Sequence, residues 1–239
     1  MTLDHRNAVL ELRQQRLAIA QRPFNARGAT VVRCPRCQIA QDHCCCPWAR
    51  PGQSPLRFVL LMHHKEPMKP TNTGRLIAEI LPDTLAFCWD RTEPDPNLLT
   101  LLADPRYQPM VVFPATHAEP SQVIETIADT PGKQPLLILL DGTWKQARRM
   151  FQSDYLAKLP VLSIDPEAAS QYKLRSAAHP HQLATAEVAA QVLALGGDQR
   201  NAQALDAYFQ VFSQRYYAGK RQLPINSEGE AFHYLEQLR

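Results

Sequence analysis

Residues 136–149 read LLILLDGTWKQARR. Five consecutive apolar residues end abruptly at Asp141 and Gly142, and a basic segment of helical composition follows. This order predicts a buried strand, a tight turn and the start of a helix. Ligands of open α/β sheets bind just beyond the carboxyl ends of the strands. Asp141 and Thr143 are therefore predicted to lie where the chemistry takes place.

Apolar runs alternate with helical segments along the rest of the chain. Predicted strands cover residues 57–63, 84–88, 109–113, 136–140 and 161–164; predicted helices cover 4–21, 73–80, 121–128, 145–151, 184–195 and 202–218. The apolar runs are continuous, as in strands that are covered on both faces. We predict an α/β fold with a mostly parallel sheet flanked by helices. Residues 221–239 are expected to form either a docking helix or a loose tail.

The composition is that of a globular protein, with 239 residues, 45% hydrophobic and 21% charged. No apolar run approaches the ~18 residues that a membrane span needs, and no signal-peptide core is visible. We therefore expect a cytoplasmic location, no membrane contact and no obligate protein partner. Residues 1–50 carry 8 Lys and Arg against 3 Asp and Glu, an excess that suits a polyanionic partner or forms a solvated basic helix.

Five of the six cysteines fall between residues 34 and 46. Cys34, Cys37, Cys44 and Cys46 form two closely spaced pairs, which favours a structural zinc ion held by four thiolates. Cys45 is expected to point away, although it or His43 could replace a ligand, and an iron–sulfur cluster is the competing metal site. We predict a small N-terminal zinc module within residues 1–50 and a second domain over 55–239. Arg33 and Arg36 flank the cysteines and could touch RNA phosphates.

Several short motifs occur in a fixed order. They are His64-x-Glu66 with Thr71-Asn72-Thr73-Gly74, Phe113-Pro114, Asp141-x-Thr143-Trp144, Ser170-x-Tyr172-x-x-Arg175 and Thr185-x-Glu187. Together with the cysteine spacing, this order resembles the DTW-domain family, the tRNA-uridine aminocarboxypropyltransferases, over nearly the whole chain. One departure is Val188, where alanine is expected.

The resemblance implies a fold related to SPOUT methyltransferases, with a C-terminal knot that holds S-adenosylmethionine. It further implies transfer of the 3-amino-3-carboxypropyl group to N3 of a uridine in the variable loop of tRNA, with release of methylthioadenosine. On this basis Asp141 is the candidate base, or else holds the turn or orients a ligand. Arg175 could clamp a carboxylate or a phosphate.

The remaining assignments follow the same resemblance. The residues expected to bind S-adenosylmethionine are Phe113, Pro114, Leu140, Asp141, Thr143, Trp144, Ser170, Tyr172, Arg175 and Thr185. The residues expected to contact the RNA are His64, Glu66, Asn72, Thr73, Arg33 and Arg36. Two alternatives stay open at this point: a SPOUT-like RNA methyltransferase, and a zinc-bearing RNA-binding protein without catalysis.

Overall fold

The computed structural model describes residues 5–20, 30–164 and 183–238. Its centre is a six-stranded sheet in the order β2-β1-β5-β3-β6-β4, and every neighbouring pair is parallel. The strands are β1 (Arg57–Met62), β2 (Leu85–Cys88), β3 (Tyr107–Val112), β4 (Val123–Ile124), β5 (Gln134–Asp141) and β6 (Val161–Leu162). The prediction of an α/β fold with a mostly parallel sheet is confirmed.

Both faces of the sheet are buried, which explains the continuous apolar runs. In β5, Leu137 and Leu139 face one core while Leu136 and Ile138 face the other. Because side chains alternate across a strand, a strand covered on both sides needs apolar residues at every position. The central strands β1 and β5 are therefore the most apolar stretches of the chain.

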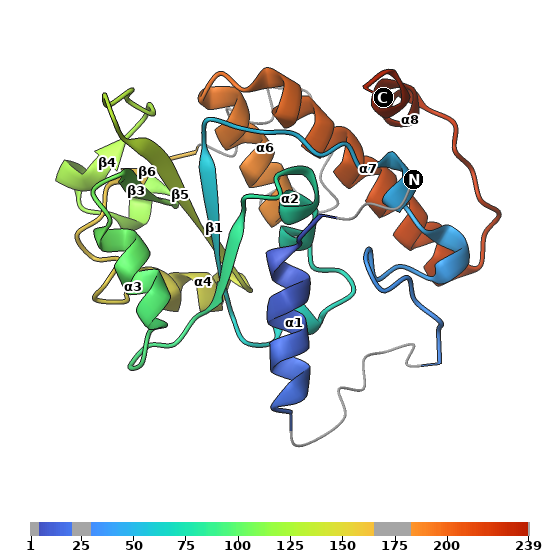
Figure 1. Cartoon of the computed structure of the whole chain (residues 1–239), viewed down its shortest axis with the longest axis horizontal. Helices are drawn as coiled ribbons and strands as arrows, with labels where there is room; N and C mark the ends of the chain where they lie inside the picture. Colours follow the sequence, from blue (N-terminus) through green and yellow to red (C-terminus); the bar gives the residue numbers. More distant parts are fainter. Residues whose placement is uncertain (1–4, 21–29, 165–182, 239) are drawn as a thin grey trace.

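Helices cover the two faces unequally (Figure 1). The larger core lies against α2 (Gly74–Ile80), α6 (Thr185–Leu195) and the long α7 (Gln199–Arg221), with α1 (Ala8–Ala18) at its side. The smaller core lies against α3 (Pro96–Ala103) and α4 (Trp144–Phe151). Within the described ranges, no helix is both long and apolar enough to cross a bilayer.

The predicted helix over residues 121–128 is wrong. A short 3-10 turn (Pro120–Gln122) leads instead into β4, whose β-branched Val123 and Ile124 pair with β6 at the sheet edge. Helix α3 was missed, although Asp95 caps it and Pro96 occupies its first position, the usual signature of a helix start.

The end of the chain forms a helix, α8 (Glu230–Gln237), so the docking-helix alternative holds. Phe232 packs edge-on against Trp48, with ring centroids 5.2 Å apart. Arg215 of α7 lies over both rings, 4.6 Å and 5.6 Å from their centroids. The helix thus fastens the segment after the cysteines to α7.

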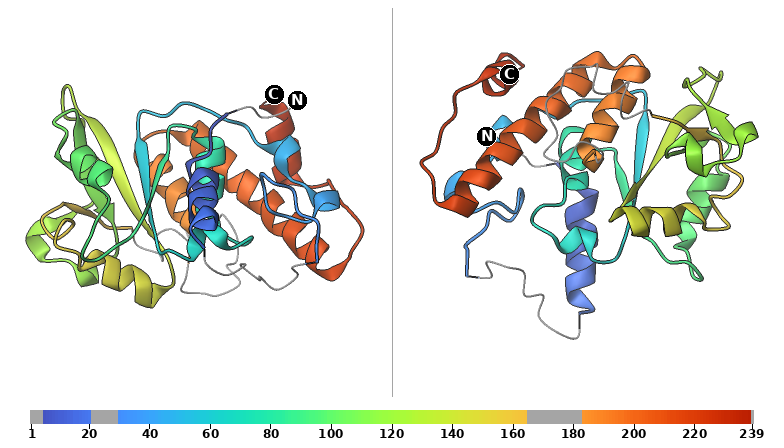
Figure 2. Two further views of the ribbon diagram at one scale, coloured as in Figure 1. Left: turned by 60° about the horizontal axis from the view of Figure 1, so that its bottom comes forward. Right: turned by 180° about the vertical axis from the view of Figure 1, so that it is seen from behind.

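The cysteine segment packs on the body of the protein. Cys37, Ile39 and Cys45 share the larger core with residues of α6 and α7, and Figure 2 shows the segment beside α7 in both views. The division into a module over 1–50 and a domain over 55–239 stays a prediction. So does the C-terminal knot, because residues 165–182, between β6 and α6, lie outside the described residues.

Candidate active site at the carboxyl edge of the sheet

Asp141 ends the central strand β5 and is 5% exposed. Asn72 Nδ2 donates to its Oδ2 at 2.8 Å, and Thr185 Oγ1 donates to its Oδ1 at 3.0 Å. Asn72 precedes α2 and Thr185 begins α6, so one carboxylate joins three motifs that are distant in sequence. The structure brings these predicted site residues together.

Gly74 makes this close approach possible. A Cβ at this position would lie 2.5 Å from Asp141 Oδ2, so any other residue here would force the carboxylate to shift. Asn72 also caps the start of α2, since its Oδ1 accepts from the Arg75 backbone N–H at 3.0 Å. Asn72 and Gly74 therefore allow the start of α2 to lie directly against the Asp141 carboxylate.

Burial raises the pKa of Asp141 to about 6, because the charged form loses its hydration. The hydrogen bonds from Asn72 and Thr185 oppose this rise, and the neighbouring carboxylate of Glu66 adds to it. A carboxyl group with a pKa near neutrality can both accept and release a proton under physiological conditions.

The turn after Asp141 is fixed by a capping box. Thr143 caps α4, and its backbone N–H donates to Gln146 Oε1 at 2.8 Å. Trp144 is the first residue of the helix and is 43% exposed. Its ring stacks on Phe113, with centroids 5.4 Å apart and an interplanar angle of 12°.

A cavity of about 260 Å³ opens beside this turn, beyond the ends of β3, β5 and β6. We refer to it as the edge cavity. It is lined by Val112, Phe113, Pro114, Leu139, Leu140, Gly142, Thr143, Trp144, Ala147, Ile164, Leu183, Thr185 and Val188. Asp141 lies behind the wall, in contact with the Thr185 hydroxyl. The cavity is mostly apolar with a few polar groups, as small-molecule sites usually are.

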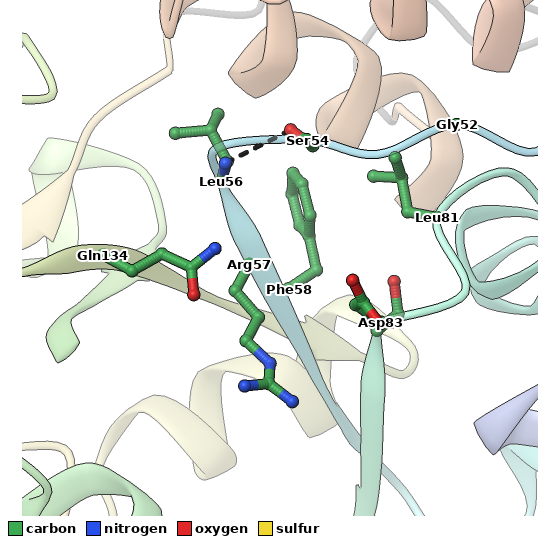
Figure 3. A pocket seen from close by; sticks show the side chains of 9 residues that line it. Gly52, Ser54, Leu56, Arg57, Phe58, Leu81, Asp83 and Gln134 are labelled. Carbon is green, nitrogen blue, oxygen red and sulfur yellow. Dashed lines mark hydrogen bonds between the residues drawn. The ribbon is translucent and has the colours of Figure 1, made fainter. Parts of the chain in front are cut away.

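A different cavity, of about 190 Å³, lies at the opposite, amino edge of the sheet. Figure 3 shows Arg57 at the start of β1, Asp83 before β2 and Gln134 at the start of β5 around it. None of the predicted donor-binding residues that the structure describes lines it. Since ligands of open α/β sheets bind at the carboxyl ends of strands, the edge cavity is the better candidate site.

Six of the predicted donor-binding residues line the edge cavity: Phe113, Pro114, Leu140, Thr143, Trp144 and Thr185. Ser170, Tyr172 and Arg175 lie outside the described residues, so their roles stay predictions.

Four of the residues assigned to RNA lie in the connection between β1 and α2 and differ in exposure. His64 is exposed and Thr73 partly exposed, whereas Glu66 is buried beside Lys69, whose Nζ donates to it at 2.5 Å. Asn72 is buried against Asp141, which makes it part of the carboxylate's surroundings. Their roles toward RNA stay predictions.

The two arginines that flank the cysteines have partners within the protein. Arg36 forms an ion pair with the buried Glu79 of α2, and its Nη2 contacts the His5 ring at 2.8 Å. Arg33 Nη1 donates to the Gln38 carbonyl at 3.1 Å. Arg36 therefore fastens the cysteine segment to α2, while its predicted role toward RNA phosphates stays untested.

The four predicted ligand sulfurs converge. The Sγ atoms of Cys34, Cys37, Cys44 and Cys46 lie within 4.8 Å of one another. Three of the pairs are 3.5, 3.7 and 3.8 Å apart. A tetrahedron with Zn–S bonds of ~2.3 Å has S···S edges of about 3.8 Å. The cluster could therefore hold a metal ion, and its dimensions fit zinc.

The fifth cysteine and the histidine point elsewhere. Cys45 is fully buried, and its thiol contacts the Tyr208 hydroxyl at 3.5 Å. His43 Nε2 bonds the Leu223 carbonyl at 3.1 Å. The expectation that Cys45 turns away from the cluster is confirmed. Arg75, only 1% exposed, donates to the Cys37 carbonyl at 2.6 Å and joins the cluster to α2.

Comparison with known protein families shows which family the chain belongs to. The model of the DTW domain matches residues 31–217, from the cysteine cluster to the end of α7. The chain belongs to the DTW-domain family. The match includes every motif on which the resemblance was based.

Two curated relatives of this DTW-domain protein carry the same name. The tRNA-uridine aminocarboxypropyltransferase 2 of Mus musculus is 31% identical over 169 residues, which are 68% of this chain and 55% of that protein. The protein of that name from Macaca fascicularis is 30% identical over the same shares. The chain thus spans about half the length of the curated relatives it matches. No solved structure matches it significantly.

Several residues that line the edge cavity were not predicted from the sequence. Ile164 and Leu183 are apolar residues in irregular segments, where no pattern distinguishes a cavity wall from core. Val188, which stands where the family resemblance predicts alanine, also lines the edge cavity. Its branched side chain leaves less space for a ligand than the expected alanine would.

Proposed function

We propose that this DTW-domain protein transfers the 3-amino-3-carboxypropyl group of S-adenosylmethionine to N3 of a uridine in tRNA, in the variable loop. The observation that carries the proposal is the buried Asp141, joined through Thr185 to a ligand-sized cavity at the carboxyl edge of the sheet. The names of the two relatives support the substrate and the transferred group. A cytoplasmic location remains a prediction.

The edge cavity suits S-adenosylmethionine, which would supply the transferable group and leave as methylthioadenosine. The exposed Trp144, supported by Phe113, offers a flat aromatic surface on which an adenine ring can stack. The apolar side chains of Leu139, Leu140 and Val188 exclude water around it. The three carbons on the sulfonium are all electrophilic, so the cavity walls must select one by orientation.

The proton of uridine N3 must leave as the new N–C bond forms. We assign its removal to Asp141, acting through the Thr185 hydroxyl. Thr185 lines the cavity, and its Oγ1 donates to Asp141 Oδ1. It can take the N3 proton while it passes its own to the carboxylate. N3 then attacks the carbon, the C–S bond breaks, and sulfur keeps the electron pair.

The cysteine cluster is proposed to hold one structural zinc ion. Four protein thiolates close the coordination sphere and leave no position for a substrate. Its role is to hold residues 30–50 against α2 and α7, and no step of the reaction involves it.

The by-product distinguishes this proposal from an RNA methyltransferase that uses the same donor. Purified protein, unmodified tRNA and S-adenosylmethionine are incubated, and the small molecules are separated by liquid chromatography. Methylthioadenosine is expected. S-adenosylhomocysteine in its place would make the protein a methyltransferase.

Replacing Thr185 by valine removes the hydroxyl at nearly constant size. We expect kcat to fall about 100-fold, because the relay to Asp141 is broken. Thr185→Ser is the matched control: it keeps the hydroxyl and should lose less than tenfold. Equal rates for the valine and serine variants, measured in single turnovers, would contradict the relay.

Replacing Trp144 by alanine should weaken S-adenosylmethionine binding about tenfold, since stacking on an aromatic ring contributes ~1–3 kcal/mol. Trp144→Phe keeps a ring and should lose less. The dissociation constant is measured by calorimetry without tRNA. Unchanged affinity in the alanine variant would remove Trp144 from the donor site.

A further inference from the structure

A third cavity, of about 220 Å³, adjoins the edge cavity. Its lining is Phe113, His117, Glu119, Gln122, Arg148, Phe151, Gln152, Leu156 and Ala157, and we refer to it as the side cavity. Phe113 lines both cavities. They are separated by a ridge of three rings, those of Phe113, His117 and Trp144, whose centroids are 5.4–5.5 Å apart.

The walls of the side cavity combine a flat apolar surface with hydrogen-bonding groups. The rings of Phe113 and Phe151 stack with centroids 4.6 Å apart. Gln122 Nε2 is engaged by the carbonyls of Ala157 and Leu159, and among the described residues nothing donates to its Oε1. Arg148, Gln152 and Glu119 are exposed. A nucleobase has the same two properties, an aromatic face and an edge of donors and acceptors.

Helix α4, which forms one wall, carries only positive charge. Lys145, Arg148 and Arg149 are exposed, and none forms an ion pair with another described residue. In contrast, Arg6, Arg36 and Arg106 each pair with a carboxylate. Like charges three and four residues apart repel each other on a helix. An external polyanion beside the edge cavity would relieve this repulsion.

We propose that the side cavity holds one unstacked base of the RNA next to the target uridine, while Lys145 and Arg149 bind the phosphates on either side. This inference rests on the proposed function and names the part of the protein that positions its RNA. The ridge then separates two neighbouring nucleotides, with the target uridine at the edge cavity. Arg148, Gln152, Gln122 and Glu119 contact the edge of the flanking base.

The test compares tRNA binding by three variants. The probe is a fluorescently labelled, unmodified tRNA transcript, titrated without S-adenosylmethionine at several salt concentrations. Lys145→Ala/Arg149→Ala should weaken binding and lower the slope of log Kd against log salt by about 1.5, as expected for two lost phosphate contacts. Gln152→Ala, which removes no charge, should weaken binding about fivefold at unchanged slope. Arg148→Ala should weaken it about tenfold.

Lys133→Ala is the matched control, because Lys133 is exposed at the amino end of β5, on the opposite edge of the sheet. It should change binding by less than twofold. Melting temperatures within ~2 °C of wild type show that the variants are folded; for these exposed residues no larger change is expected. If Arg148→Ala and Gln152→Ala bind tRNA with the same Kd as Lys133→Ala, the side cavity does not hold a base.

A kinetic measurement separates this inference from the proposed function. In aminocarboxypropyl transfer, the variants of α4 should raise the KM for tRNA and leave the KM for S-adenosylmethionine unchanged. If these variants catalyse the transfer with the same KM for tRNA as Lys133→Ala, the proposed role of the side cavity is wrong and the proposed function stands. Loss of tRNA affinity in a protein that forms no aminocarboxypropyl product supports the RNA site and overturns the proposed reaction.

Discussion

Asp141→Asn is expected to lower the rate of aminocarboxypropyl transfer about 1000-fold. The amide keeps the size of the side chain and can still accept one hydrogen bond from Asn72 or Thr185, but it cannot take a proton. General-base catalysis contributes ~10²–10⁴-fold. The measurement is single-turnover transfer to tRNA at saturating S-adenosylmethionine. A rate within tenfold of wild type would show that Asp141 only holds the turn.

The pH profile supplies an independent readout for the same residue. The pKa of Asp141 is raised to about 6, so the carboxylate that accepts the proton disappears as the pH falls through 6. The wild-type rate should rise between pH 5 and 7 and then level off, whereas the residual rate of the variant should lack this step.

Stability serves as the control for folding. The folded-state pKa lies above the usual value of 3.8, so proton binding stabilises the fold below about pH 4, and this contribution is lost as the pH rises through 6. Asp141→Asn should therefore be at least as stable as wild type at pH 8. A lower rate in a protein of equal melting temperature assigns the effect to chemistry.

Cys37→Ser is expected to abolish stoichiometric metal binding and to lower the melting temperature by about 10 °C or more. Structural zinc contributes many kcal/mol to folding, and ~1 kcal/mol shifts the melting temperature by ~2–4 °C in a chain of this size. Cys37 is 3% exposed and lies in the larger core, so the loss should spread to α2 and α7. Metal content by mass spectrometry and calorimetric unfolding check both effects.

Cys88→Ser provides the matched control, since Cys88 ends β2, outside the cysteine cluster. It should keep one zinc ion per chain. One zinc ion per chain in Cys37→Ser would refute the assignment of Cys37 as a ligand. Iron instead of zinc in the wild-type protein would show that the cysteines hold an iron–sulfur cluster.

The parallel sheet and the cysteine cluster could be predicted because both depend on local spacing. The apolar run of β5 and the abrupt stop at Asp141 follow from burial on both faces. The Cys34 and Cys37 pair forms a short turn, in which Gln38 adopts a positive φ of 60°. Such features require no knowledge of distant parts of the chain.

The surroundings of Asp141 could not be predicted from residue spacing, because they depend on contacts across long stretches of sequence. Nothing local to Thr185 shows that its hydroxyl meets a carboxylate 44 positions earlier. The same holds for Arg36, whose position beside the cysteines suggested RNA, while Glu79 on α2 is its partner. Only the resemblance to a family, based on the order of the motifs, suggested that Thr185 and Asp141 belong to the same site.

The most direct test of the central claim is mass spectrometry of nucleosides from unmodified tRNA incubated with the purified protein and S-adenosylmethionine. The account predicts a uridine heavier by one aminocarboxypropyl group with the wild type, and almost none with Asp141→Asn. A methylated nucleoside, or an unmodified tRNA pool after incubation with folded, metal-loaded protein, would contradict it.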